Sequence, residues 1–315
     1  MTLLRDIGEH SFIREVISNY LDEEKLVDIN YLPNTDLGVK IDGFKLSYTF
    51  DYMNFYDLGW KAVTATSSDM ISGGISPRYF LTSVGLKKEL ELDSAIKLLE
   101  GIKDAVRYYN GLLIGGDTND SAEGWIDVVG IGEIMCRIPY VLAPGDIIIL
   151  TNPIFYAALG FVLISRNIKP PMKVLSKLKH PIINSSLVNV IKDNCKSITY
   201  TTDISDGLLI SLSNILHINK NFGIKLNKMP IIPDVQEMMK EYNISVAELL
   251  KYSGEDFESI IVTKPTKVKE LMNELYDYGF EPDIIGEITD SNPGKILLKG
   301  ENIVIHGWDN FKGWF

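Results

Sequence analysis

The sequence predicts a two-domain protein that mixes helices and strands, and three observations support this fold class. Its 315 residues exceed what one hydrophobic core usually organises. Segments with strand-like alternation and segments with helical periodicity follow one another along the chain. A turn-rich connector, PYVLAPGD at residues 139–146, separates two such sets. We therefore expect one domain over residues 1–138 and a second over residues 139–315.

In the first domain, the segment Ile41–Asp51 alternates apolar and polar residues, which predicts a strand that ends in an aspartate. The pattern over Leu58–Ile71 predicts a helix, and the glycine pair at 73–74 would end it. Asp69 falls in the last turn of this helix, where the helix dipole disfavours a carboxylate. We therefore expect a cationic side chain beside Asp69.

The first domain then continues with a helix and two strands. Helical periodicity from Leu92 to Tyr109 predicts a helix capped by Asp93. The short apolar run Leu112–Ile114 predicts a strand that ends in GGDTN, where two glycines allow a tight turn or close approach to a ligand. Residues Ile126–Ile134 predict another strand, broken by glycines at 130 and 132. A mixed sheet with mostly antiparallel pairing follows from these elements.

The second half alternates between strand and helix patterns up to a terminal hairpin region. We expect strands at 147–150, 197–202, 258–262 and 283–288, and helices at 155–165, 184–193, 208–219 and 267–278.

Composition and charge restrict the possible functions. The net charge of −11 argues against nonspecific binding of nucleic acid. No apolar run approaches the roughly 20 residues that span a bilayer, and the charged N-terminal segment is unlike a signal peptide. Cys136 and Cys195 are isolated in the sequence, which favours a reducing compartment and argues against a disulfide framework or structural zinc. We therefore expect a cytoplasmic protein.

Aspartates recur at the ends of predicted elements and in turns rich in glycine or serine. Loops at element ends are where sites are commonly built. If several carboxylates converge, they need cations, and Mg²⁺ prefers carboxylate oxygens together with phosphates and water. Each of these aspartates, taken alone, is also a common turn or capping residue. The set comprises Asp36, Asp51, Asp69, Asp117, Asp203, Asp206 and Asp256.

Five local motifs make this set more specific. They read, in order, SSDMISGGISPR, LIGGDTND, TTDISDGL, SGEDFE and GWDNF. Together they resemble the thiamine-monophosphate kinase family, which belongs with the phosphoribosylaminoimidazole synthetases, selenophosphate synthetases and hydrogenase-maturation dehydratases. The resemblance covers nearly the whole chain. It implies a synthetase-like fold, with an N-terminal sheet domain that binds ATP and metal and dimerises, and a C-terminal α/β domain that completes the cleft.

The resemblance also implies a reaction and the residues that support it. The family transfers a phosphoryl group directly from ATP to thiamine monophosphate, so positioning and Mg²⁺ ions suffice without a catalytic base. The implied metal ligands are Asp36, Asp51, Asp69, Asp117, Asp203 and Asp206. Gly116, Asp117 and Ser205 would contact ATP, and Glu255 and Trp308 would hold the acceptor. The implied partners are ATP, thiamine monophosphate and a second copy of the chain.

The sequence departs from the family pattern at two places. Where the family has a pair of aspartates, only Asp36 is present, and the segment after Asp51 lacks the family's glycine and histidine. Arg137 is the nearest candidate for the family's nucleotide-binding arginine. Two alternatives therefore stand beside the kinase: an ATP-dependent enzyme of the same fold with another small acceptor, and a non-catalytic nucleotide-binding protein.

Overall fold

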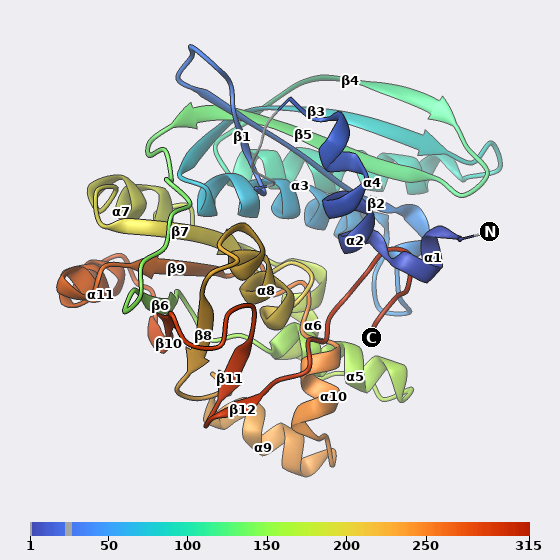
Figure 1. Ribbon diagram of the computed structural model, residues 1–315. Helices are drawn as coiled ribbons and strands as arrows, with labels where there is room; N and C mark the ends of the chain where they lie inside the picture. The colour runs from blue at the N-terminus through green and yellow to red at the C-terminus, as the bar shows by residue number, and fades with distance from the viewer. Residues whose placement is uncertain (1, 23–26) are drawn as a thin grey trace. The chain divides into compact units, whose positions relative to one another are not determined.

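The computed structural model describes residues 2–22 and 27–315, and the chain divides into two compact units (Figure 1). The five-stranded unit comprises Asp28–Ile138 and Leu175–Lys196. The seven-stranded unit comprises Met1–Val27, Pro139–Val174 and Ser197–Phe315. The chain therefore changes unit at Pro139, where the connector lies. Residues 1–27 belong to the unit formed mainly by the second half of the sequence, and residues 175–196 belong to the unit formed mainly by the first half.

The five-stranded unit contains a mixed sheet with the strand order β1-β2-β5-β3-β4. Only β3 and β4 pair in parallel among the described strands of this sheet, which confirms the predicted mostly antiparallel pairing. A parallel pair needs a crossover connection, which α4 provides. The strands are β1 (Asn30–Tyr31), β2 (Leu37–Lys45), β3 (Ile75–Leu86), β4 (Leu112–Asp120) and β5 (Trp125–Ile134).

Two long helices, α3 (Phe55–Ser72) and α4 (Leu92–Tyr108), pack side by side against one face of this sheet (Figure 1). The helix α3 begins at a capping box formed by Asn54 and Asp57 and ends at Gly73, as predicted. The predicted cap of α4 was wrong, because Glu91 is the N-cap residue and Asp93 lies in the first turn. A shorter helix, α7 (Leu187–Asp193), contacts α3.

Two predicted strand limits and one predicted strand break in this unit were wrong. The strand β2 ends at Lys45, and Asp51 lies in an exposed turn beyond the 3-10 helix η2 (Leu46–Tyr48). The strands β4 and β5 both continue through their glycines. A Cβ atom at Gly116 would lie 2.2 Å from the Thr82 backbone oxygen, and one at Gly130 would lie 2.3 Å from Met70 Sδ. Gly116 therefore permits close packing of β4 against β3, and Gly130 close packing of β5 against α3, without a turn.

The seven-stranded unit contains a second mixed sheet, with the order β12-β11-β8-β10-β6-β9-β7. The predicted strands at 147–150, 197–202, 258–262 and 283–288 are confirmed within one residue at each end. The strands are β6 (Ile147–Leu150), β7 (Ile198–Asp203), β8 (Gly223–Leu226), β9 (Ser259–Thr263), β10 (Asp283–Thr289), β11 (Ile296–Leu298) and β12 (Glu301–Asn302).

The helix α8 contacts β7 and β8 of this second sheet. Among the described residues, no helix is long and apolar enough to cross a bilayer. The helices of this unit are α1 (Leu4–Ile7), α2 (Glu9–Glu15), η1 (Ile17–Tyr20), α5 (Tyr156–Ser165), α8 (Leu208–Ile218), α9 (Pro233–Glu241), α10 (Val246–Lys251), η3 (Pro265–Lys267) and α11 (Val268–Asp277). The residues of α6 (Met172–Lys179) are shared between the two units, which divide after Val174.

A disulfide bond joins Cys136 and Cys195 inside the five-stranded unit, with Cα atoms 5.6 Å apart. The expectation of two unpaired thiols was therefore wrong. The cysteines are separated by 59 positions in the sequence, and they meet because residues 175–196 fold back onto the unit that contains β5. Isolated cysteines carry no signal of such a return, so spacing alone could not predict the bond.

Candidate functional site

The helix α3 places Asp69 at a buried position in its last turn, where the carboxylate is 5% exposed. The ammonium of Lys40, from β2, lies 2.6 Å from Asp69 Oδ2. Burial acts to lower the pKa of Lys40, but Asp69 and two further carboxylates outweigh it, so this pKa is raised above its ordinary value. The predicted cation beside Asp69 is thus confirmed.

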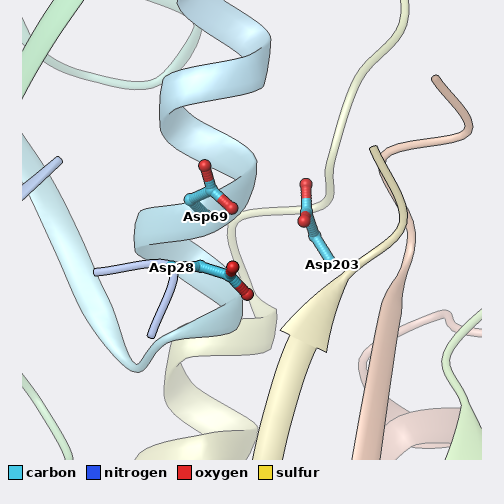
Figure 2. Close-up of side chains that lie close together, drawn as sticks. All are labelled: Asp28, Asp69 and Asp203. Atoms are coloured by element: carbon cyan, nitrogen blue, oxygen red, sulfur yellow. The ribbon is translucent and has the colours of Figure 1, made fainter. Parts of the chain in front are cut away.

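A second carboxylate, that of Asp28, lies close to Asp69 in the same unit. Asp28 precedes β1, and its carboxylate oxygen lies within 4.8 Å of one from Asp69 (Figure 2). Two carboxylates at this separation repel each other unless a cation lies nearby, and oxygen donors of this kind suit Mg²⁺. Asp28 is not among the ligands predicted from the sequence, because no local motif marks it.

The other predicted ligands of the five-stranded unit lie elsewhere in it. Asp36 is exposed in the turn between β1 and β2, and Asp51 is exposed after η2. Asp117 is exposed in β4, where Asn119 Nδ2 donates a 2.7 Å hydrogen bond to its carboxylate. In contrast, Asp42 of β2 contributes with Asp28 and Asp69 to the raised pKa of Lys40. Asp42 is therefore a third carboxylate that acts on Lys40.

Arg137, the candidate for a nucleotide-binding arginine, is engaged within the five-stranded unit. Its guanidinium donates to the Thr35 backbone oxygen at 2.6 Å and lies 5.2 Å from the centre of the Tyr31 ring. These contacts hold the Arg137 side chain beside β1.

In the seven-stranded unit, three loops meet through backbone hydrogen bonds. Asp203 is 3% exposed at the end of β7 (Figure 2), and the loop after it carries Ser205 and Asp206. The Ser205 backbone oxygen accepts from Glu255 N at 2.6 Å, and the Asp206 backbone oxygen accepts from Trp308 N at 2.9 Å. The fold thus brings together four residues that the sequence places up to 103 positions apart, on the motifs TTDISDGL, SGEDFE and GWDNF.

The backbone of the SGEDFE loop is held in an unusual conformation. Glu255 and Phe257 have φ values of 61° and 51°, in the left-handed region that non-glycine residues seldom adopt. Such conformations persist where surrounding structure fixes them, and they concentrate at functional sites. Between them, Asp256 accepts from Phe155 N at 2.9 Å, at the start of α5. Asp256 therefore has the capping role that is common for aspartate.

The Trp308 side chain is half-buried and lies near other aromatic rings of its unit. Its ring centre is 5.0 Å from that of Trp314, in an edge-to-face arrangement, and its indole nitrogen donates to Asn310 Oδ1 at 3.1 Å. Packing against Trp314 and the hydrogen bond to Asn310 thus orient the indole, which remains partly exposed.

Comparisons with known proteins agree with this architecture. Residues 22–134 match the family described as "AIR synthase related protein, N-terminal domain". The thiamine-monophosphate kinase of Pyrobaculum calidifontis is 25% identical over 311 residues, which is 98% of each chain. That of Methanocaldococcus jannaschii is 32% identical over 241 residues, or 71% of this chain and 74% of its own. The solved structure described as AaThiL complexed with AMPPCP and TMP has a TM-score of 0.85 at 20% identity, and the match covers 98% of this chain and 99% of that one.

The family match identifies residues 22–134 as an AIR synthase-related N-terminal domain. Within this class, the chain belongs to the thiamine-monophosphate kinase family.

Proposed function

We propose that this chain transfers the γ-phosphoryl group of ATP to the phosphate of thiamine monophosphate, which yields thiamine diphosphate and ADP. The observation that carries the proposal is the match over 98% of the chain to a relative named for this activity. The protein described as complexed with AMPPCP and TMP has the same fold, which supports ATP as the co-substrate.

Mg²⁺ is the metal that suits the donor set. The Asp28 and Asp69 carboxylates lie close enough for one cation to contact both, and a protein cation, Lys40, already lies against one of them. We propose Asp28 and Asp69 as ligands, together with Asp36, Asp51, Asp117, Asp203 and Asp206 from the sequence prediction. Bound Mg²⁺ would neutralise phosphate charge and align the reacting groups.

The side chains of the protein would bind and orient the two substrates. Gly116 would offer its backbone, and Ser205 its hydroxyl, to the nucleotide. Glu255 and Trp308 would hold the acceptor, because an indole stacks well on a flat heteroaromatic ring. The acceptor oxygen is already anionic, so no base is needed for its attack on phosphorus.

We propose that the enzyme is a cytoplasmic homodimer. The face of the five-stranded sheet opposite α3 and α4 exposes apolar side chains on the strands β2, β3 and β4: Ile41 is 59% exposed, Tyr79 44% and Leu112 62%. A second copy of this sheet would cover them, since exposed apolar patches of this kind commonly mark interfaces. Analytical ultracentrifugation of the wild type and of Ile41→Lys tests this: a dimer is expected for the wild type, and a monomer for the variant. A monomeric wild type would refute it.

The experiment that tests the reaction uses purified protein with ATP, Mg²⁺ and thiamine monophosphate, followed by chromatography for thiamine diphosphate. Product formation is expected. ADP release only with another acceptor would favour the alternative enzyme of the same fold, and nucleotide binding without turnover would favour the non-catalytic protein.

Replacement of Trp308 by alanine tests the acceptor site. We expect a higher KM for thiamine monophosphate and a nearly constant KM for ATP, with a loss of about 0.5–1.5 kcal/mol from the aromatic pairing beyond area burial. A parallel rise of both constants would show that Trp308 is structural.

A further inference from the structure

The two ends of the chain are joined within the seven-stranded unit, at the loop that carries Trp308. Asp309 is 2% exposed, and its carboxylate accepts from Glu9 N at 2.8 Å and from Phe311 N at 2.9 Å. His10 Nε2 donates to the Trp308 backbone oxygen at 2.9 Å. The rings of Phe12 and Phe311 pack edge to face at 6.0 Å. We call this set of contacts the terminal clasp.

Asn310 connects the terminal clasp to the indole of Trp308. Its amide nitrogen donates to both carboxylate oxygens of Glu9, at 2.8 and 2.7 Å, and its backbone nitrogen donates to Glu9 Oε2 at 3.0 Å. A carboxylate only accepts, so the NH₂ group of the amide must face Glu9. The amide oxygen of Asn310 is thereby directed at Trp308 Nε1, which donates to it at 3.1 Å.

The contacts through Asn310 orient the indole at its nitrogen edge. Charge-assisted hydrogen bonds such as those to Glu9 are stronger than neutral ones, so Asn310 is held firmly. On the other side, Trp314 packs against the Trp308 ring, and the Trp308 backbone is tied to Asp206. Without Glu9, Asn310 loses three hydrogen bonds, two of which orient its side-chain amide, and the hydrogen bond from Trp308 Nε1 to the amide oxygen is weakened.

We propose that Glu9 and Asn310 are positioning residues that set the plane of the Trp308 indole for a flat aromatic acceptor. The proposal rests on the proposed function for the identity of that acceptor. It gives the N-terminal helix α2, where Glu9 is the first residue, a part in acceptor specificity. Neither residue would touch the substrate, because both act through the tryptophan.

The kinetic test compares Glu9→Ala, Glu9→Gln and a control variant, Lys312→Met. Lys312 Nζ also joins the two ends, through a 3.0 Å hydrogen bond to the Ile7 backbone oxygen, but it has no part in the Asn310 amide contacts. We expect Glu9→Ala to raise the KM for thiamine monophosphate about 2- to 10-fold with the KM for ATP unchanged, as the loss of a hydrogen bond predicts. Glu9→Gln keeps an accepting oxygen and should recover most of the loss, and Lys312→Met should leave both constants unchanged.

A spectroscopic test separates this proposal from the proposed function, because it needs no turnover. Protein labelled with 5-fluorotryptophan carries four fluorine signals, and Trp308→Phe identifies the one from Trp308. We expect Glu9→Ala and Asn310→Leu to shift or broaden that signal, whereas Lys312→Met leaves it in place. An unmoved Trp308 signal in Glu9→Ala would overturn the proposal, as would equal rises of both KM values. A wild type without kinase activity but with the expected shifts would refute only the function.

Discussion

The ion pair between Lys40 and Asp69 makes a prediction that links stability to metal binding. The ammonium and carboxylate lie 2.6 Å apart, and their side chains are 19% and 5% exposed. Replacement of Lys40 by methionine keeps most of the side-chain length but removes the ammonium that lies 2.6 Å from Asp69, while the Asp69 carboxylate stays buried beside Asp28. Removal of one partner from a buried ion pair costs about 3–5 kcal/mol. We therefore expect Lys40→Met to lower the free energy of unfolding by about 3 kcal/mol or more when EDTA removes divalent metal.

Mg²⁺ should then restore much of this loss. A ligand that binds only the folded state at 100 times its dissociation constant stabilises it by about 2.7 kcal/mol. Urea denaturation with EDTA and with saturating Mg²⁺ measures both quantities. The matched control is Lys45→Met on the same strand, whose pair with Glu123 is 3.5 Å long and exposed; such pairs contribute about 0–1 kcal/mol. The reasoning is refuted if Lys40→Met in EDTA lies within 1 kcal/mol of the wild type, or if Mg²⁺ stabilises both proteins equally.

Three further predictions concern separate parts of the five-stranded unit. Cys136→Ser should lower the free energy of unfolding by about 4 kcal/mol, because the bond to Cys195 closes a loop of 59 positions. Reduction by dithiothreitol should lower the free energy of unfolding of the wild type by the same amount and should leave that of the variant unchanged. Burial raises the pKa of Asp57, but hydrogen bonds from His180, the Asn54 backbone and Lys179 outweigh it, so the pKa is below its ordinary value of 3.8. Its ionised form therefore stabilises the fold above about pH 4, and this contribution should disappear as the pH falls through the lowered pKa. Urea titrations of the wild type and of Asp57→Asn from about pH 2 to about pH 6, across the ordinary carboxyl range, should give free energies of unfolding that converge at the acid end. Asp117→Asn should reduce turnover far more than thermal stability, since Asp117 is exposed, and an unchanged rate would remove it from the proposed ligands.

Local chemistry was sufficient to predict part of the site. A carboxylate in the last turn of a helix opposes the helix dipole, so a cation beside Asp69 could be expected before its partner was known. The helix itself was predictable from its period and its terminal glycines. The loops that carry Asp203, Glu255 and Trp308 were predicted by motif, and backbone hydrogen bonds join them in the fold.

The parts that could not be predicted depend on contacts between distant segments. Asp28 meets Asp69 only because the segment before β1 passes the end of α3, and no local pattern marks it. Asp51 was predicted to end a strand because apolar and polar residues alternate up to it, but the strand β2 ends at Lys45. Glycine in β4 was taken as a turn signal, although β3 packs too closely there to allow a side chain at Gly116.

The central claim is that this chain moves the terminal phosphoryl group of ATP onto thiamine monophosphate. ATP labelled with ³²P in its γ-phosphoryl group follows that group directly, when the purified protein is incubated with Mg²⁺ and thiamine monophosphate. We expect label in thiamine diphosphate, in one-to-one ratio with the ADP formed, and no transfer in EDTA. Label released only as inorganic phosphate, or transferred only to a different acceptor, would contradict the account.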